Sequence, residues 1–452
     1  MGRDIKRYYL LIIFGLMMAM LICELAARIL TRDSNGIDSG LKSVSFHPPK
    51  SDKVINLLIL GESTAHGAAY DPKASPAAVA VSYLQEALPD FTFKKNVVAW
   101  GGSLLEENIR RLSQIKIIDR PDIVVVIAGH NLFLSSFSAR SQCSSTAARV
   151  EDSLLSYSAF LRWMLPRIKI LKRGERPDSA SRDFFDKPVV CPVIWRQTLA
   201  SFGDNLSAIA DFCNSHNIPL LVFLTAGNEA DTNPTRSVYK GQQVDQKNFK
   251  ALFNTGQKHS LSGNFSEAAI CFEEARKIDG NHAENLFWLG RTYLELNNLG
   301  EATKFFGLAR DLDGFPWRAI SDERTILKET AEKKFFKWFD IRDIIQKNYP
   351  QSVLGSDLFY DRHHMAIGPY NLVGFEIAKQ VCQQFKCDPQ GLQQISEKDL
   401  ARKVGFTKSD LLKLLKTTVY WYRNASGYQQ EQIFSLRTMI ECPSSTRQVS
   451  RQ

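Results

Sequence analysis

Two short apolar runs constrain the fold of this chain more than any other feature, because each stops at a glycine followed by polar residues. Residues 54–60 (Val-Ile-Asn-Leu-Leu-Ile-Leu) lead into Gly-Glu-Ser at 61–63, and residues 122–128 (Asp-Ile-Val-Val-Val-Ile-Ala) lead into Gly-His-Asn at 129–131. Runs of this length and composition are typical of strands buried on both faces, which occur in parallel sheets. The sequence therefore predicts an α/β fold around a parallel sheet.

Further segments fit the same plan, because predicted strands alternate with predicted helices along the chain. This alternation predicts a parallel sheet with helices on both faces, and ligands bind such sheets beyond the carboxyl ends of the strands. Residues 135–190 are rich in Ser and Arg and are interpreted as an insertion or lid. Further strands are expected at 95–99 and 219–225, and helices at 76–88, 104–118, 195–214, 334–347, 368–385 and 397–422.

The N-terminal residues have the pattern of a membrane segment. Basic residues at positions 3, 6 and 7 precede an uncharged run from Tyr8 to Cys23, which Glu24 ends. A membrane span needs roughly 17–25 residues, so the run is short but can be extended by its amphipathic ends. A cleaved signal peptide and a retained anchor are both compatible with it. Because Glu24 and Leu25 intervene before any small-residue cleavage site, we favour the anchor, with a cytoplasmic N-terminus and the remainder in a periplasm-like space.

Charge and cysteine content exclude some functions. The chain has 57 Lys and Arg against 48 Asp and Glu, a net charge of +9, but the excess is diffuse and accompanies no nucleic-acid motif. We read it as a solvated basic surface, or as one that faces anionic lipid or an acidic polymer. The eight cysteines include no CxxC pair. In an exported domain Cys143–Cys191 or Cys382–Cys387 could pair; free buried thiols are the alternative.

An internal repeat occupies residues 249–314. A shift of 34 positions superposes Ala268 on Ala302 and Phe272 on Phe306, together with six further identities. Thirty-four residues is the period of the tetratricopeptide repeat, a helix-turn-helix unit. Between the matched segments, residues 283–297 are also helical in pattern, so the chain holds one and a half to two units. So few repeats rarely stand alone, and we expect them to pack against the rest of the protein.

Polar residues that follow the predicted strands offer the groups needed for nucleophilic catalysis. Ser63 follows a strand and precedes small residues, which would lift its hydroxyl above the sheet; a helix-capping serine is the alternative. Asn131 can donate to an oxyanion or can be an ordinary loop residue. Asp361 and His364 lie three residues apart before a helix, so one turn can present both to one serine. No set of residues has metal-ligand spacing, so neither a metal nor a cofactor is expected.

These segments, in this order, resemble the four sequence blocks of the SGNH, or GDSL-type, hydrolase family. The resembling segments are 61–65, 99–103, 129–131 and the Asp361-x-x-His364 pair. The resemblance implies a flavodoxin-like three-layer sheet, Ser63 as nucleophile, His364 as general base and Asp361 as its orienting carboxylate. It also implies an oxyanion hole made by the Ser63 amide, a glycine amide and the Asn131 side chain. Gly102 is preferred over Gly101 for the glycine.

The likeness is greatest to a bacterial subgroup that carries an N-terminal membrane helix and tetratricopeptide repeats, and it covers residues 54–385. Glu62 stands where many family members have Asp, Ala99 where the second block usually begins with Asn, and Leu132 where this subgroup has Glu. Asn228 ends another strand and either lines the pocket or is a turn residue. The serine precedes the Asp-His pair, as in the esterases and unlike the alginate-type O-acetyltransferases.

The expected organisation has six parts. An N-terminal anchor (1–30) and a linker (31–53) precede the first part of the hydrolase domain (54–248). All-helical repeats (249–315) are inserted before its second part (316–390), and a helical extension and tail (391–452) follow.

Three functions fit these observations. The first is a serine carboxylic ester hydrolase acting on an acylated glycan or lipid outside the cytoplasm. The second is an O-acyltransferase of an envelope polysaccharide, which differs only in the nucleophile that meets the acyl-enzyme. The third is a non-catalytic assembly protein that binds a protein partner through its repeats.

Overall fold

A computed structural model describes residues 53–137, 189–385 and 391–407, apart from 69, 71–72 and 115–116. It also describes short pieces near both ends, at 18–19, 22–23, 41, 44–47, 409–410, 412–413 and 416.

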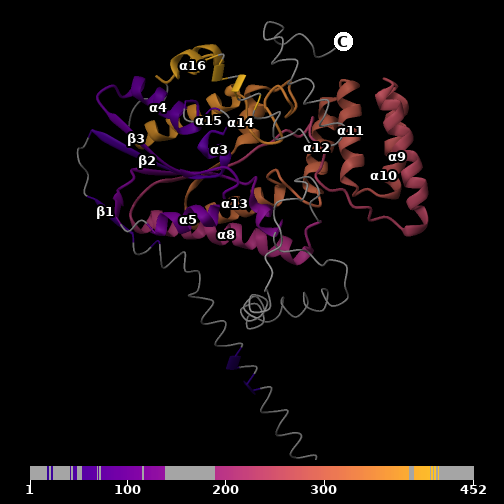
Figure 1. Ribbon diagram of the computed structural model, residues 1–452, viewed down its shortest axis with the longest axis horizontal. Helices are drawn as coiled ribbons and strands as arrows, with labels where there is room; N and C mark the ends of the chain where they lie inside the picture. The colour runs from indigo at the N-terminus through magenta and orange to yellow at the C-terminus, as the bar shows by residue number, and fades with distance from the viewer. Residues whose placement is uncertain are drawn as a thin grey trace, which may run out of the picture.

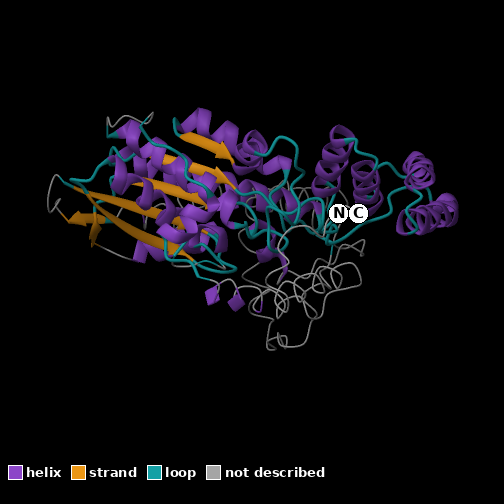
Figure 2. Ribbon diagram, turned by 90° about the horizontal axis from the view of Figure 1, so that it is seen from above, coloured by secondary structure: helices purple, strands orange, loops and turns teal. Residues whose placement is uncertain are grey.

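The centre of the structure is a parallel five-stranded sheet with the order β3-β2-β5-β6-β7 (Figures 1 and 2). Within this sheet β3 pairs on one side of β2, and β5, β6 and β7 are added on the other side. This is the strand order of doubly wound, flavodoxin-like sheets. The expected three-layer parallel sheet is therefore confirmed. Its strands are β2 (Val54–Gly61), β3 (Thr92–Ala99), β5 (Ile123–Ala128), β6 (Leu220–Leu224) and β7 (Lys337–Asp340).

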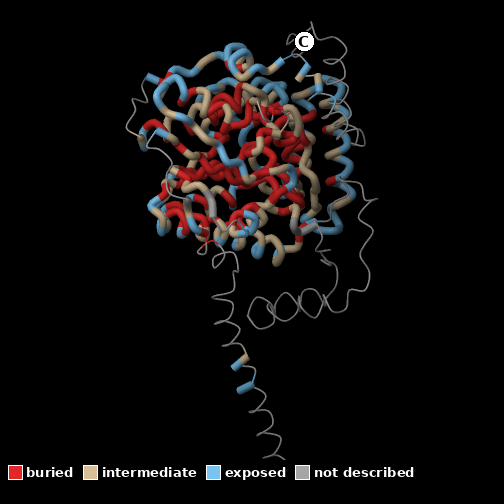
Figure 3. The backbone as a smooth tube through the Cα atoms, turned by 60° about the vertical axis from the view of Figure 1, so that its left-hand side comes forward, coloured by how far each residue is buried: buried red, intermediate tan, exposed pale blue. Residues whose placement is uncertain are grey.

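Helices cover both faces of the sheet (Figures 1 and 2). Successive residues of a strand point to opposite faces, so Leu57 and Ile59 enter one apolar core while Leu58 and Leu60 enter the other. The sheet and the helix faces against it form the buried interior in Figure 3. The first core is formed with α3 (Ser63–His66), α4 (Pro76–Ala87), α14 (Ile341–Asn348), α15 (Ile367–Gln384) and α16 (Glu397–Lys403), and the second with α5 (Leu105–Gln114), α8 (Pro192–Ser215) and α13 (Ser321–Lys334).

Two expected elements have different structures, and both differences involve short strands. The residues expected to form one helix over 334–347 instead form strand β7 and then α14, because Lys337–Asp340 pairs with β6 at the edge of the sheet. The helix expected over 104–118 ends at Gln114, and Ile117–Asp119 forms β4. This strand pairs in parallel with β1 (Ser45–His47), inside the segment interpreted as a linker.

The C-terminal helix is also shorter than expected. Helix α16 ends at Lys403, and Gly405 follows with φ +66°, a left-handed conformation that stops a helix. The helix predicted over 397–422 is therefore interrupted, and residues beyond 416 lie outside the described part. The lid interpreted at 135–190 is described only at its two ends: the 3-10 helix η1 (Leu132–Phe137) and residues 189–190.

Most of the expected N-terminal anchor lies outside the described residues. Within the part of the chain that the structure describes, no helix is both long and apolar enough for a membrane span. Of the cysteines considered above, Cys191 and Cys382 are disulfide-bonded. Their expected partners, Cys143 and Cys387, are not described, whereas Cys213 and Cys271 are free thiols.

Four helices between β6 and β7 pack side by side at one end of the sheet (Figure 1). The two halves of this segment use the same packing contact 34 residues apart. A Cβ on Gly256 would lie 2.7 Å from the Phe272 ring, and a Cβ on Gly290 would lie 2.7 Å from the Phe306 ring. Each glycine thus lets an aromatic ring pack against the neighbouring helix backbone. The helices are α9 (Gln246–Leu261), α10 (Phe265–Ile278), α11 (Ala283–Glu295) and α12 (Leu299–Asp311).

A second equivalent pair, Asp279 and Asp313, joins these helices to the chain that enters them. Asp279 accepts hydrogen bonds from the amides of Lys240 and Asn281. Asp313 accepts from the amides of Thr235 and Arg236. Both carboxylates thereby bind the extended chain that follows β6, which includes the 3-10 turn η2 (Gln243–Asp245). The repeat consequently packs against the α/β body through backbone contacts.

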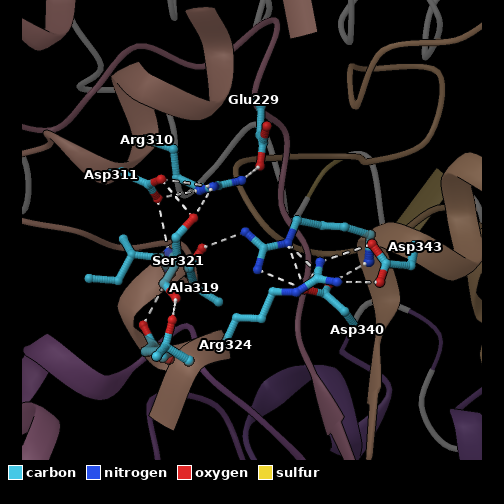
Figure 4. Close-up of polar contacts among 12 residues, drawn as sticks. Glu229, Arg310, Asp311, Ala319, Ser321, Arg324, Asp340 and Asp343 are labelled. Atoms are coloured by element: carbon cyan, nitrogen blue, oxygen red, sulfur yellow. Dashed lines mark hydrogen bonds and ion pairs between the residues drawn. The ribbon is translucent and has the colours of Figure 1, made fainter. Parts of the chain in front are cut away.

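Ion pairs complete this junction (Figure 4). Arg310 at the end of α12 is buried and pairs with Glu229, which follows β6, and with Asp311. Asp311 also accepts hydrogen bonds from Ser321 at the start of α13. Arg324 of the same helix pairs with both Asp340 and Asp343. Helix α13 thus makes polar contacts both with the end of the repeat helices and with the residues of and after β7.

The packing of α11 against α12 gives a prediction for stability. Gly290→Ala should destabilise the protein by about 1–3 kcal/mol, because its methyl group would overlap the Phe306 ring. The control is Gly307→Ala, also within a helix, where the added Cβ would lie 3.9 Å from Nη2 of Arg310. This variant should be neutral or more stable by about 0.5–1 kcal/mol. Thermal unfolding followed by circular dichroism measures both, and equal stability of the two variants would contradict the proposed contact.

Candidate active site

The site begins where β2 ends and a sharp turn brings Ser63 to the first position of α3. Gly61 makes this turn with φ +149°, and a Cβ there would lie 2.1 Å from the carbonyl oxygen of Ile127 on β5. Only glycine fits so close to the neighbouring strand. Its amide donates to Asn108 Oδ1 at 2.6 Å and its carbonyl accepts from the Ser103 hydroxyl at 3.0 Å. The position of Ser63 is therefore fixed by the strand before it.

The loop before α15 brings a histidine and a carboxylate to this serine. His364 Nε2 lies 2.8 Å from Ser63 Oγ, and His364 Nδ1 lies 2.7 Å from Asp361 Oδ2. The other Asp361 oxygen accepts from the backbone amides of His363 and His364, at 2.9 and 2.8 Å. One short turn thus holds the carboxylate against the ring. The structure brings together the three residues that the sequence singled out, although 301 residues separate Ser63 from His364.

This arrangement gives the two ionisable groups opposite pKa shifts. Burial alone would lower the pKa of His364, but the Asp361 charge and hydrogen bond raise it above its ordinary value. Burial would raise the pKa of Asp361, yet the charge of His364 and its hydrogen bonds hold it well below the usual range. Asp361 is therefore ionised at neutral pH. A histidine oriented in this way can accept a proton from a hydroxyl at its free nitrogen.

Two further histidines lie beside His364. The His363 ring is 4.3 Å from that of His364 and 5.0 Å from that of His130, measured between centroids. Burial and then the charge of His364 lower the pKa of His363 to about 3, and burial lowers that of His130 well below its ordinary value. Both rings are neutral at physiological pH, whereas His364 is the one of these three whose pKa is raised.

The same loop contains a potential metal-ligand set. Ligand atoms of Asp361, His363 and His364 lie within 4.8 Å of one another. Two of these residues already bond to each other, and His364 also contacts Ser63. A metal ion here would have to displace those contacts, so the arrangement fits proton transfer better than metal binding.

The residues expected to complete an oxyanion hole lie on two neighbouring loops. Asn131 is buried after β5, and its side-chain amide donates to the carbonyl oxygen of Ser103 at 3.1 Å. Gly102 lies in the exposed turn before Ser103 and has φ +75°, which favours glycine. The hydrogen bond from Asn131 therefore joins the glycine turn to the loop after β5.

The polar groups of Asn228 form structural hydrogen bonds and do not point into an open pocket. Its backbone amide donates to the carbonyl of Arg362 at 2.8 Å, and its side chain bonds to Ser356 and to the amide of Asp231. The Asn228 carbonyl accepts from the buried Arg318. These bonds attach the Asp-His loop to the end of β6. Of the two readings of Asn228, the turn residue fits these contacts.

Sequence reasoning missed the residues that hold the loops of the site. Arg362, which lies between Asp361 and His363 in the sequence, is buried. Its guanidinium donates to the carbonyl of Asn233 and the hydroxyl of Thr235. Glu62, next to the nucleophile, bonds to backbone amides of the loop after β5. Only their place in the sequence could have indicated these two residues, since each is adjacent to a residue predicted to be catalytic.

A pocket lies beside this loop. It has a volume of about 180 Å³ and is formed by the ends of β2 and β5 with the first turns of α5 and α8. Glu62 and Gly129 lie at the sheet side, and the rest is lined by apolar and neutral polar side chains together with the acidic Glu106 of α5. Those side chains include Leu105, Leu132, Phe202, Thr198, Ser201 and Asn205.

Comparison with known proteins finds structural similarity but no match by sequence. Neither a protein-family model nor a curated protein sequence matches this chain. An acetylxylan esterase from Geobacillus stearothermophilus is similar with a TM-score of 0.32 and 10% identity, over 78% of this chain and 95% of that one. An alpha/beta hydrolase enzyme from the metagenome of Lake Arreo, Spain, is similar with a TM-score of 0.32 and 11% identity, over 74% and 95%. We therefore infer function from the geometry of the site itself.

The opposite shifts of the histidines can be measured directly. In side-chain NMR titrations, His364 should hold its proton to a pH above 6.5, whereas His363 should stay neutral down to about pH 3. Asp361→Asn should lower the pKa of His364, because the stabilising charge is lost while burial remains. An unchanged His364 titration in this variant would show that the two side chains do not interact in solution.

Proposed function

We propose that this chain is a serine carboxylic ester hydrolase of the SGNH type, with Ser63, His364 and Asp361 as its catalytic residues. The observation that carries the proposal is the continuous contact from Ser63 Oγ through His364 to Asp361, at 2.8 and 2.7 Å. Residues joined in this order are those required to activate a serine hydroxyl. The position of Ser63 beyond the carboxyl end of β2 supports the same assignment, because doubly wound sheets bind ligands at that edge.

The proposed reaction has two halves. Ser63 Oγ attacks the acyl carbonyl carbon while His364 Nε2 takes the hydroxyl proton, and this proton then passes to the leaving alcohol as the ester bond breaks. Water next attacks the acyl-enzyme, gives its proton to His364 and releases the acid. His364 returns that proton to Ser63. Throughout, Asp361 stabilises the imidazolium and keeps its ring in one orientation.

The charge that develops on the carbonyl oxygen needs donors. We assign these to the Ser63 amide, the Gly102 amide and the Asn131 side chain. Asn131 supports this role because its amide has a second N–H beyond the one given to Ser103, and no other described residue accepts it. One such donor is worth about 10²–10³-fold in rate in a related mechanism.

We further propose that the N-terminal apolar run anchors the enzyme, with its catalytic domain outside the cytoplasm and an acylated glycan or lipid as substrate. The basic residues before that run support the orientation. We interpret α9–α12 as two tetratricopeptide-type units, which the equivalent Gly256–Phe272 and Gly290–Phe306 contacts support. Their free surface is then available to a protein partner.

The test is loss of the nucleophile. Ser63→Ala should abolish hydrolysis of p-nitrophenyl acetate and labelling by a fluorophosphonate probe, because the hydroxyl proposed to form the acyl-enzyme is removed. Ser82→Ala is the matched control, since its hydroxyl donates only to Val79 within α4, and it should keep full activity. Labelling of another residue, or undiminished turnover in Ser63→Ala, would refute the assignment. Product analysis with a glycan acceptor would separate hydrolysis from acyl transfer.

A further inference from the structure

Glu62 makes an unusual set of contacts next to the candidate nucleophile. Its carboxylate is buried, with 2% of the residue exposed, and accepts hydrogen bonds from three successive backbone amides. Oε1 accepts from Gly129 at 3.0 Å, and Oε2 accepts from His130 at 2.9 Å and Asn131 at 3.1 Å. Successive amides that point to one place form an anion-binding concavity. Here the anion is supplied by the protein itself.

These contacts lie between β2 and β5, where the order in which the chain adds strands to the sheet reverses. Gly61 pairs with Ile127, so β2 and β5 end side by side, and the chain beyond each strand then carries one part of the site. Ser63 follows β2, whereas Asn131 follows β5. Glu62 connects the two loops, because its backbone belongs to the first and its carboxylate binds the second. Movement of one loop is therefore coupled to the other.

We propose that Glu62 is a positioning residue that holds Asn131 at the oxyanion and places a carboxyl group on the residue next to Ser63. The inference rests on the proposed esterase function. Without the carboxylate, three buried amide donors would lose their acceptor, at a cost that the loop could avoid only by moving. The side chain of Asn131, which also binds the Ser103 carbonyl, would move with the loop. Glu62 does not contact the substrate in this role.

The carboxyl group of Glu62 also interacts electrostatically with His364. Burial raises the pKa of Glu62 to about 7, although the three amide bonds and His364 act to lower it. The Glu62 charge is also among the causes that raise the pKa of His364. Among the described residues, Asp361, His363 and His130 interact electrostatically with His364, the buried Glu323 interacts with Glu62, and Glu106 lines the pocket beside Glu62. Of these, Asp361 is the dominant carboxylate for His364, so the contribution of Glu62 is secondary and must be measured against it.

Two substitutions distinguish the effect of the Glu62 charge from the effect of its side-chain length. Glu62→Gln keeps the length of the side chain but removes the charge and turns one acceptor into a donor that faces amides. Its kcat for p-nitrophenyl acetate should fall about 10- to 100-fold with KM nearly unchanged, as expected for a misplaced catalytic group. Because a negative charge stabilises the imidazolium, its loss should move the acid limb of the kcat/KM profile to lower pH. Glu62→Asp keeps an ionisable carboxyl group, so its acid limb should lie closer to the wild-type pH than that of Glu62→Gln, while its shorter reach should lower kcat severalfold.

The matched control is Asp279→Asn. Asp279 is another buried carboxylate that accepts backbone amides, but it lies in the repeat segment. This variant can lose stability but should keep the wild-type kcat and acid limb. Thermal unfolding of every variant accompanies the kinetics. If Glu62→Gln kept wild-type kcat, or lost activity without any shift of the acid limb, Glu62 would have no more than a structural role and the proposal would fail.

A readout that does not need catalysis separates this inference from the proposed function. The pKa of His364, measured by NMR in the full-length protein, should be lower in Glu62→Gln than in the wild type and unchanged in Asp279→Asn. If wild-type protein neither hydrolysed esters nor reacted with a fluorophosphonate, the esterase assignment would fail. The NMR shift would then still show whether Glu62 acts on His364. If Glu62→Gln did not fold, Glu62→Asp would decide, since wild-type kcat in that variant would overturn the positioning role.

Discussion

The parallel pairing of β2 with β5 is the constraint on which the rest of the site depends. Parallel strands that are neighbours in the sheet end at the same edge, so the residues after Gly61 and after Ala128 have to share one small space. Close approach of the strands excludes any side chain at position 61, and the buried carboxylate of Glu62 accepts the amides that emerge from β5. The positions of Ser63 and of the loop beside it thus follow from sheet topology, and the histidine loop needs only to reach that edge.

The buried strands could be predicted from the sequence, whereas the edge strand β7 and the short strands β1 and β4 could not. All six residues of β5 are buried, so hydrophobicity alone marks the strand. Strand β7 has the sequence Lys-Trp-Phe-Asp, and only its last residue is buried. Its conformation comes from hydrogen bonds to β6, and these depend on residues more than a hundred positions away. The same holds for β1 and β4, which are three residues long and stabilise each other.

A similar division applies to the candidate site. Ser63, Asp361 and His364 were predictable because their side-chain chemistry is distinctive and because they follow recognisable strand or helix boundaries. The supporting contacts were not, since most of them involve backbone groups. Glu62 binds amides, Arg362 binds a carbonyl, and Asn228 is held through its own backbone. Backbone groups are the same in every residue, so no sequence pattern marks which of them a side chain will meet.

The insertion of a helical segment between β6 and β7 also affects when the candidate site can form during protein synthesis. Ser63 and His364 are separated by 301 positions. At translation rates of about 5–20 residues per second, the ribosome completes the second residue roughly 15 s to a minute after the first. The early strands can pair during that interval, but the hydroxyl has no base beside it until the last part of the sheet is synthesised. A nascent chain, or one shortened before residue 364, would therefore lack the contact between His364 and Ser63.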